Sequence, residues 1–258
     1  MSTANTPPNL ASGDAQALAQ RAWAPAREAA TSPATLDLPL AGLRVLDLSQ
    51  GIAGPYCGLV LRQQGAQVIK VEPPTGDWSR LMGRQQEGLS AIFLACNAGK
   101  TGLAIDASTP QGKAQLQALA QDADVIVQNY RPGVAERMGM GWAEMSARKP
   151  GLVYVSVTGW GPSGPMAKVP TVDTTMQAAS GIMHANRGAD GQPRRVGLFL
   201  VDLSTGLYAA QATLAALLRQ ARTGQGRHVE VSMLHTAAAL QSYLVIDAAL
   251  YPGTESPV

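Results

Sequence analysis

The chain has 258 residues, of which 46% are apolar and 15% are charged, and its formal net charge is +2. This length and composition allow a sizeable core in one large or two small domains, and no run of Lys or Arg indicates nucleic acid or an anionic membrane as the main partner. Two cysteines are too few for a disulfide framework, and the three scattered histidines predict no metal site.

The first 37 residues are rich in Ala, Pro, Ser and Thr, and prolines interrupt them. They allow one short helix over 15–30, so we expect a flexible N-terminal extension over 1–37 and a single globular domain over 38–258. The start lacks a charged segment followed by an apolar one, and each long apolar run is broken by polar residues or Gly. We therefore expect no signal peptide, no membrane span and a cytoplasmic location.

A strand–turn–helix–strand unit opens the globular domain. Residues 43–48 (LRVLDL) form an apolar run typical of a buried strand, a helix starts near Pro55 and ends at Gly65, and 67–72 form a second strand. This order predicts a parallel βαβ crossover. Glu72 stands where a dinucleotide-binding fold places its ribose-binding acid, but the turn lacks the G-x-G-x-x-G pattern, which argues against NAD.

Strands and helices alternate through the rest of the chain. We predict strands over 101–106, 124–128, 152–158 and 228–233, and helices over 90–96, 109–122, 174–184, 205–222 and 234–250. This alternation predicts an α/β fold with a mainly parallel open sheet and flanking helices.

A polar loop, NYRPG, follows the predicted strand that ends at Gln128. Ligands of open sheets bind beyond the carboxyl ends of strands, so Arg131 and Arg137 could meet phosphate there and Asn129 could orient a polar group. A solvated loop with an arginine packed on Tyr130 fits the same residues equally well. The cations that add positive charge to this edge are Arg80, Arg84 and Lys100.

One acid stands at the end of an apolar run, where Val196–Tyr208 reads VGLFLVDLSTGLY. Asp202 precedes the helical pattern of Thr205–Arg222, and a helix N-cap is its commonest role. A carboxylate at the positive end of a helix can also act as a nucleophile. Asp173 precedes another predicted helix and is better explained as an N-cap than as a catalyst.

Eight motifs together resemble those of the family III CoA-transferases (CaiB/BaiF type), which include formyl-CoA and carnitine-CoA transferases. Each motif is weak alone, but all eight occur in the family's order and spacing between about Leu38 and Leu250. They read LAGLRVLDLSQGIAGPYCG, GAQVIKVEPPTGDWSR, CNAGKTGLAIDA, DADVIVQNYRPGVAERMG, GLVYVSVTGWGPSGP, DTTMQAASG, VGLFLVDLSTGLYAA and GQGRHVEVSML.

This resemblance implies transfer of coenzyme A between an acyl-CoA thioester and a small carboxylic acid, in a homodimer and without a metal. The family's nucleophilic aspartate falls at Asp202, which forms first a mixed anhydride and then an aspartyl-CoA thioester. The resemblance places coenzyme A along Gln50, Gly51, Ile52, Ala53, Pro73, Ile105, Asn129, Tyr130, Arg131 and Arg137.

Two alternatives follow from departures from the family pattern. The related 2-methylacyl-CoA racemases carry a His before the acid at position 173, but Val172 stands here, so one acid/base group is missing. Family members are longer than this chain, so the small domain and the Gly-rich loop over the nucleophile would lie beyond Val258. The chain is then a fragment, a non-catalytic CoA-binding subunit, or one part of a split enzyme that a second chain completes.

Overall fold

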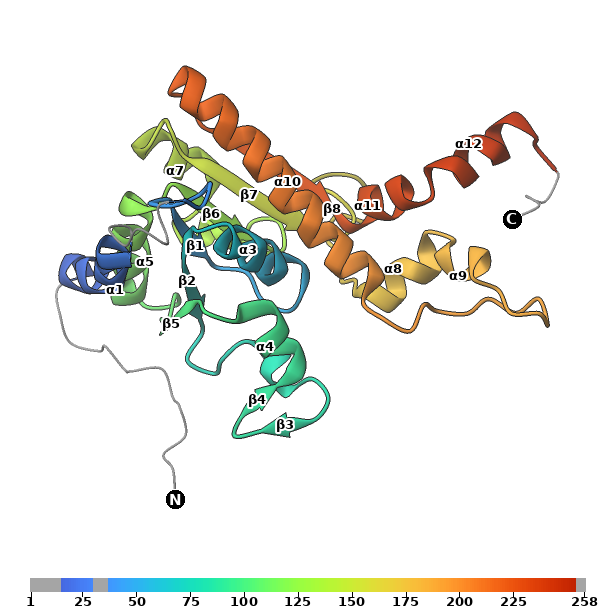
Figure 1. Ribbon diagram of the computed structural model, residues 1–258, viewed down its shortest axis with the longest axis horizontal. Helices are drawn as coiled ribbons and strands as arrows, with labels where there is room; N and C mark the ends of the chain where they lie inside the picture. The colour runs from blue at the N-terminus through green and yellow to red at the C-terminus, as the bar shows by residue number, and fades with distance from the viewer. Residues whose placement is uncertain (1–14, 30–36, 254–258) are drawn as a thin grey trace.

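A six-stranded parallel sheet forms the centre of the computed structural model, which describes residues 15–29 and 37–253 (Figure 1). The spatial order is β5-β2-β1-β6-β7-β8, and all five neighbouring pairs are parallel. This confirms the predicted α/β class. The strands are β1 (Arg44–Asp47), β2 (Gln67–Glu72), β5 (Thr101–Ala104), β6 (Val125–Gln128), β7 (Val153–Thr158) and β8 (Arg227–Ser232).

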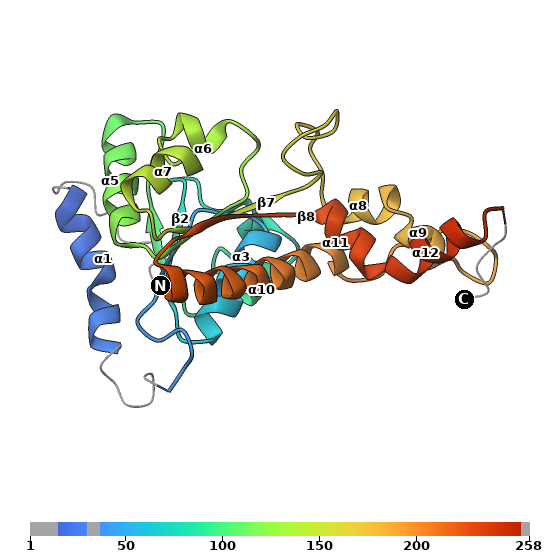
Figure 2. The ribbon, with the colours of Figure 1, turned by 90° about the horizontal axis from the view of Figure 1, so that it is seen from above.

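Helices cover both faces of this sheet, which explains why its strands are apolar along their length. Figure 2 shows α5 (Pro110–Asp122), α6 (Val134–Arg137) and α7 (Trp142–Arg148) on one face. On the opposite face lie α3 (Ala53–Gln63) and α10 (Leu200–Thr223). Side chains of β1, β2, β6 and β7 alternate between the two resulting core clusters, and β6 is fully buried on both sides.

The direction of winding reverses between β1 and β6. From β1 the chain proceeds outward through β2 to β5, and then returns to add β6, β7 and β8 on the other side of β1. The segment after β1 leads to α3 on one face, while the segment after β6 leads to α6 and α7 on the other. The two loops therefore separate at the carboxyl edge, and a crevice at such a point is the usual ligand site of an open α/β sheet.

One helix of the predicted N-terminal extension is packed into the core. In α1 (Ala15–Ala29), Leu18 and Trp23 are buried against α5, and the Trp23 indole Nε1 donates to the Leu119 carbonyl over 3.3 Å. This part of the extension is therefore docked, which corrects the expectation that all of 1–37 is flexible. The rest of that prediction concerns residues 1–14 and 30–36, which lie outside the described part, and the domain boundary at 38 stays a prediction.

A helical arm projects from one end of the sheet (Figures 1 and 2). It contains α8 (Asp173–Ala179), α9 (Ile182–Ala185), α11 (Met233–Leu240) and α12 (Ser242–Leu250). The predicted single helices over 174–184 and 234–250 are wrong: Gly181 interrupts the first at a φ of 87°, and the second bends by 69° near Gln241. Among the described helices none alone could cross a membrane, although the bent pair α11 and α12 together have sufficient length and apolar composition.

Of a small excursion between β2 and β5, only the helix over 90–96 was predicted. The excursion consists of the 3-10 helix η1 (Trp78–Leu81), the short hairpin strands β3 (Gln85–Gln86) and β4 (Leu89–Ser90), and α4 (Ala91–Asn97). Only its last helix had a sequence signal, the N-cap Ser90, whose hydroxyl accepts a hydrogen bond from the Phe93 N–H.

Candidate active site

A cavity of about 660 Å³ lies where β1, β6 and β7 end and α10 begins. It occupies the crevice at which the winding of the sheet reverses. The residues of its wall that the sequence predicted are Gln50, Ile52 and Ala53 after β1, Asn129, Tyr130 and Arg131 after β6, and Asp202 in α10.

Asp202 lies in the first turn of α10, because this helix begins at Leu200 rather than at Thr205. Phe199 occupies the N-cap position, so the interpretation of Asp202 as an N-cap is wrong. The Asp202 carboxyl is half-buried on the cavity wall, and no described residue donates a hydrogen bond to it. Burial, with the neighbouring Asp173 carboxylate, raises the pKa of Asp202 to about 7.

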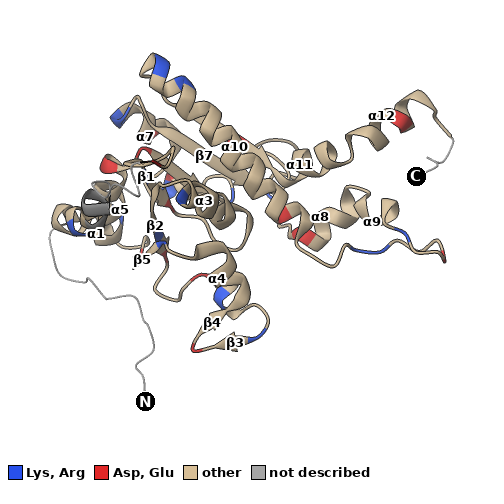
Figure 3. Cartoon of the chain, in the orientation of Figure 1, with Lys and Arg blue, Asp and Glu red and all other residues tan. Residues whose placement is uncertain are grey.

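Asp173 caps the helix that carries Asp202 instead of its own helix. The Asp173 Oδ2 atom accepts hydrogen bonds from the backbone N–H of Val201 over 2.8 Å and of Asp202 over 3.0 Å. No side chain caps α8, whose N-cap is Val172. Figure 3 shows acidic positions close together where α8 meets the start of α10. The expected capping role is therefore present, but it serves a helix that follows much later in the chain.

Asn129 joins the two loops that separate at the crevice. Its side-chain oxygen accepts from the Gln50 N–H over 2.8 Å, and its side-chain nitrogen donates to the Gln50 carbonyl over 2.7 Å. Both polar atoms of Asn129 thus hold the β1 loop against the β6 loop. In the same loop, the Tyr130 N–H donates to the Gln128 Oε1 atom over 2.7 Å. The loop is braced at two points rather than merely solvated.

Because Gly51 has no side chain, the Trp78 ring packs directly against its backbone at the cavity. The φ of Gly51 is +82°, a conformation that favours glycine, and a Cβ added there would lie 2.3 Å from the Trp78 ring. The Gly51 N–H donates to the Asp77 carboxylate over 3.0 Å. Trp78 lines the cavity and is 49% exposed, and it was not predicted as a site residue.

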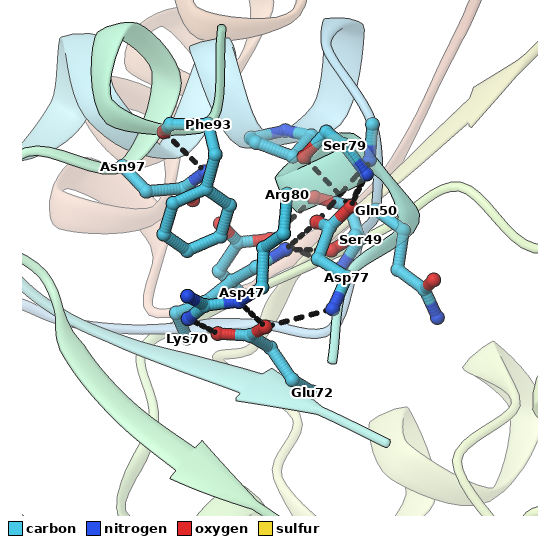
Figure 4. Close-up of polar contacts among 12 residues, drawn as sticks. Asp47, Ser49, Gln50, Lys70, Glu72, Asp77, Ser79, Arg80, Phe93 and Asn97 are labelled. Carbon is cyan, nitrogen blue, oxygen red and sulfur yellow. Dashed lines mark hydrogen bonds and ion pairs between the residues drawn. The ribbon is translucent and has the colours of Figure 1, made fainter. Parts of the chain in front are cut away.

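Two buried ion pairs lie next to this wall, and Figure 4 shows the residues of the first, Lys70 and Asp77. The Lys70 Nζ lies 2.9 Å from the Asp77 carboxylate, and the Lys100 Nζ lies 2.8 Å from that of Asp47, with both lysine side chains 1% exposed. Burial acts to raise the pKa of Asp47, but the two ammonium groups outweigh it and hold this pKa below its ordinary value.

Two of the cations expected at this edge are therefore not free to bind a ligand. Lys100 is committed to Asp47, and the Arg80 guanidinium forms two hydrogen bonds with Glu72 over 2.6 and 2.8 Å while stacking on the Phe93 ring. This corrects the prediction that Arg80 and Lys100 add positive charge to the site. Arg131, by contrast, is exposed on the cavity wall and forms no ion pair with a described residue.

Four predicted binding residues lie off the cavity wall. Gly51 sits between wall residues of the same turn, and Arg137 is exposed on α6. Pro73 and Ile105 follow β2 and β5 at the carboxyl edge, and the Ile105 side chain is buried in the core. Wall residues that the sequence did not indicate include Trp78, Met82, Pro132, Val134, Val157, Thr158, Ala167, Val169, Pro170, Thr171, Thr174, Phe199 and Met233. Most are apolar and carry no chemical signal in the sequence.

The model of the family described as CoA-transferase family III matches residues 40–257 of this chain. The probable fatty acyl-CoA transferase Rv3272 of Mycobacterium tuberculosis is 39% identical over 207 residues, which cover 79% of this chain and 52% of that protein. The succinyl-CoA:glutarate CoA-transferase of Mus musculus is 39% identical over 203 residues, 78% of this chain and 47% of its own length. The acetyl-CoA:oxalate CoA-transferase of Acetobacter aceti is 38% identical over 218 residues, 83% of this chain and 56% of its own length.

Solved structures show the same likeness. The crystal structure of a CAIB/BAIF family protein from Brucella suis has a TM-score of 0.80 and 34% sequence identity, and covers 85% of this chain and 59% of that one. The crystal structure of Rv3272 from M. tuberculosis has a TM-score of 0.77 and 37% identity, with coverage of 85% and 60%. The chain spans about half the length of the curated relatives it matches.

Proposed function

The chain belongs to CoA-transferase family III, and we propose that it transfers coenzyme A from an acyl-CoA thioester to a carboxylic acid with Asp202 as the nucleophile. The observation that carries this proposal is the position of Asp202. It is the ionisable side chain of α10 on the cavity wall, and its carboxylate is free of hydrogen bonds from described residues. Relatives named for exchange between succinyl-CoA and glutarate and between acetyl-CoA and oxalate support the reaction class.

The proposed reaction proceeds through two covalent intermediates on Asp202. A carboxylate oxygen attacks the thioester carbonyl, the C–S bond breaks, and CoA leaves as a thiolate from a mixed anhydride. The thiolate then attacks the aspartyl carbonyl, which releases the donor acid as a carboxylate and leaves an aspartyl-CoA thioester. The acceptor carboxylate attacks the carbonyl of this thioester, the C–S bond breaks, and CoA leaves again as a thiolate from a second anhydride. CoA thiolate attacks its acyl carbon, so that the new acyl-CoA and the Asp202 carboxylate are formed.

The protonation state of Asp202 controls the first step. Because the pKa of this carboxyl is raised to about 7, the group is partly protonated near neutral pH, and only the ionised form attacks. The elevated pKa also makes the ionised form more basic than an ordinary aspartate and therefore a better nucleophile. The rate of adduct formation is accordingly expected to rise with pH up to about 7.

We assign binding of the nucleotide part of CoA to the two loops at the crevice. Arg131 offers an exposed guanidinium for a phosphate, and Gln50 and Tyr130 lie on the same wall. Arg137, Pro73 and Ile105 belong to this proposal only as residues at the margin of the site. The acyl group would then extend toward Asp202, where Phe199 provides an apolar surface.

The position before Asp173 supports transfer rather than racemisation. Val172 lines the cavity and is 56% exposed, so the side chain beside the acid has no group that can accept or donate a proton. A binding subunit completed by another chain has no specific observation in its favour. A homodimer and a cytoplasmic location stay proposals that follow from the family resemblance.

Trapping the first intermediates tests the proposal. The protein is incubated with acetyl-CoA or succinyl-CoA, treated with hydroxylamine, digested and mapped by mass spectrometry. We expect a hydroxamate at Asp202 that is lost in Asp202→Asn and retained in Asp190→Asn, a control at an exposed acid paired with Arg194. A hydroxamate at another residue, or none at all, contradicts the proposal.

A further inference from the structure

We propose that Asp173 and Gln177 are positioning residues that fix the first turn of α10, and with it the backbone of Asp202, at the cavity. The inference rests on the proposed role of Asp202 as nucleophile. It assigns a function to two buried polar side chains of α8, of which Asp173 also lines the cavity. Their contacts all lead to one segment, Val196–Asp202.

Asp173 is used at both of its carboxylate oxygens. It is 3% exposed, and one oxygen accepts the N–H groups of Val201 and Asp202, while the other accepts the side-chain amide of Gln177 over 2.5 Å. Helix α10 has no side-chain cap of its own at Phe199. The backbone of the nucleophile is therefore held by a residue from a different helix, α8, because the free N–H groups at the start of α10 have no side-chain acceptor at the N-cap position.

Gln177 extends the same brace toward the loop before α10. It is fully buried, and its side-chain oxygen accepts the Val196 N–H over 2.8 Å. Its side-chain nitrogen donates to the Leu198 carbonyl over 3.3 Å as well as to Asp173. Since residues four apart lie on one face of a helix, α8 presents Asp173 and Gln177 together to the entire segment that leads into Asp202.

The charge of Asp173 affects Asp202 in a way that capping alone does not require. A neutral Ser or Asn caps a helix about as well as Asp does, whereas a carboxylate next to Asp202 opposes ionisation of the nucleophile. Two titratable groups interact electrostatically with Asp202: the Asp173 carboxylate in α8 and the Cys96 thiol in α4. The Cys96 thiol in α4 stays neutral, because burial raises its pKa to about 11. Asp173 thus both places Asp202 and keeps its carboxyl basic.

Two variants separate the two effects. Asp173→Asn keeps the size of the side chain and removes its charge, while Gln177→Met keeps the approximate volume and removes the brace to Val196. Asp190→Asn is the matched control, since Asp190 is an exposed acid of the preceding loop. Each variant is examined by a ¹³C NMR titration of the Asp202 carboxyl and by the single-turnover rate of hydroxylamine trapping, with circular dichroism to establish folding.

We expect Asp173→Asn to move the Asp202 titration midpoint to lower pH. At pH 8, where Asp202 is mostly ionised in both proteins, it should also reduce the trapping rate by about tenfold, because one asparagine oxygen cannot accept from both the α10 N–H groups and Gln177, and because the Asp202 carboxylate becomes less basic. Gln177→Met should reduce the rate similarly and leave the midpoint in place. Folded variants with an unchanged midpoint and an unchanged rate overturn the inference, even if their melting temperatures fall. Absence of any adduct in the unmodified protein contradicts the proposed function instead, and the titration arm then decides this inference alone.

Discussion

Asp202 illustrates how much of the site could be read from residue types. Its sequence context predicted a helix start, and the structure places it as the third residue of that helix, on a cavity wall. Lys100 shows the opposite case, because nothing in its local sequence indicates that Asp47, more than fifty positions earlier, forms an ion pair with it. Pairings between distant residues depend on the tertiary fold, so they could not be predicted from local sequence.

The raised pKa of Asp202 predicts a specific dependence of stability on pH. Its folded-state pKa of about 7 exceeds the ordinary aspartate value of 3.8, so the folded protein binds the proton more tightly than the unfolded chain does. The stabilising effect of the protonated group is complete below about pH 4 and is lost as the pH rises through 7. Asp202→Asn should therefore be equal in stability to the unmodified protein near pH 4 and more stable by about 2 kcal/mol at pH 8, about half of the full linkage value because solvent screens the half-buried carboxylate.

Urea denaturation at a series of pH values measures this difference. Asp190→Asn serves as the control with the opposite sign, because hydrogen bonds from the Gln192 N–H and from Arg194 lower the pKa of Asp190. An Asp202→Asn variant that is less stable at pH 8 than at pH 4, relative to the unmodified protein, would show that the carboxylate is stabilised rather than strained in its pocket.

Gly51 gives a second prediction at the residue scale. Gly51→Ala must adopt a φ of +82° and also displace the Trp78 ring, whereas Gly83→Ala adopts a φ of +71° in open space. Both variants lose about 1 kcal/mol from backbone strain, and Gly51→Ala should lose about 1–3 kcal/mol more from the collision. Thermal unfolding measures the losses, and isothermal titration with acetyl-CoA should show weaker binding for Gly51→Ala alone. Equal effects of the two substitutions would contradict the assigned contact.

At the scale of the elements, the sheet and its crossovers were predictable and the arm was not. The apolar runs and their bounding turns indicate the parallel strands, since strands buried on both faces need apolar side chains throughout. The break of α8–α9 at Gly181 and the bend at Gln241 depend on packing within the arm, where Met176, Val201 and Met233 share a small separate core. Periodicity alone continues a helix through such positions.

The contact between α3 and α10 supplies a prediction at this scale. A Cβ on Gly206 would lie 2.7 Å from the Ala53 carbonyl oxygen, which is backbone and cannot turn away. An alanine in an open helix position gains about 1 kcal/mol over glycine, so the sign of the effect tests the contact. We expect Gly206→Ala to destabilise the protein by about 1–2 kcal/mol in urea denaturation, because overpacking outweighs helix propensity.

Gly197→Ala is the control for that substitution, since a Cβ there meets no atom within 4 Å. A stabilising effect of Gly206→Ala would mean that the two helices are further apart than described. Because Ala53 lines the cavity, a forced separation of α3 and α10 should also lower the rate of trapping at Asp202.

At the scale of the whole molecule, the composition of the N-terminal region did not predict that its helix, α1, packs into the core. Its Ala-rich sequence resembles a tail, yet Trp23 is fully buried between α5 and the Arg44 side chain, whose guanidinium lies 5.8 Å from the ring. This helix precedes the range matched by the family, which begins at residue 40. The sequence could not reveal where it docks, because no local pattern specifies a partner so distant along the chain.

Trp23→Ala tests the contribution of this helix to global stability. Loss of a fully buried indole and its hydrogen bond to Leu119 should cost about 3–5 kcal/mol in urea denaturation. Leu218→Ala, at a side chain that is 62% exposed, should change the free energy of unfolding by less than about 0.5 kcal/mol. Similar small losses for both substitutions would show that α1 is not part of the cooperative core.

The passage of oxygen through Asp202 is the most direct measurement of the central claim. The protein is incubated with acetyl-CoA and acetate whose carboxylate carries ¹⁸O, and the peptide that contains Asp202 is analysed by mass spectrometry. If both anhydrides form on Asp202, an oxygen of the acceptor remains on its carboxylate after each turnover, so the label should appear there and be absent at Asp173 and Asp190. Exchange of acetyl groups without ¹⁸O in Asp202 would contradict the account.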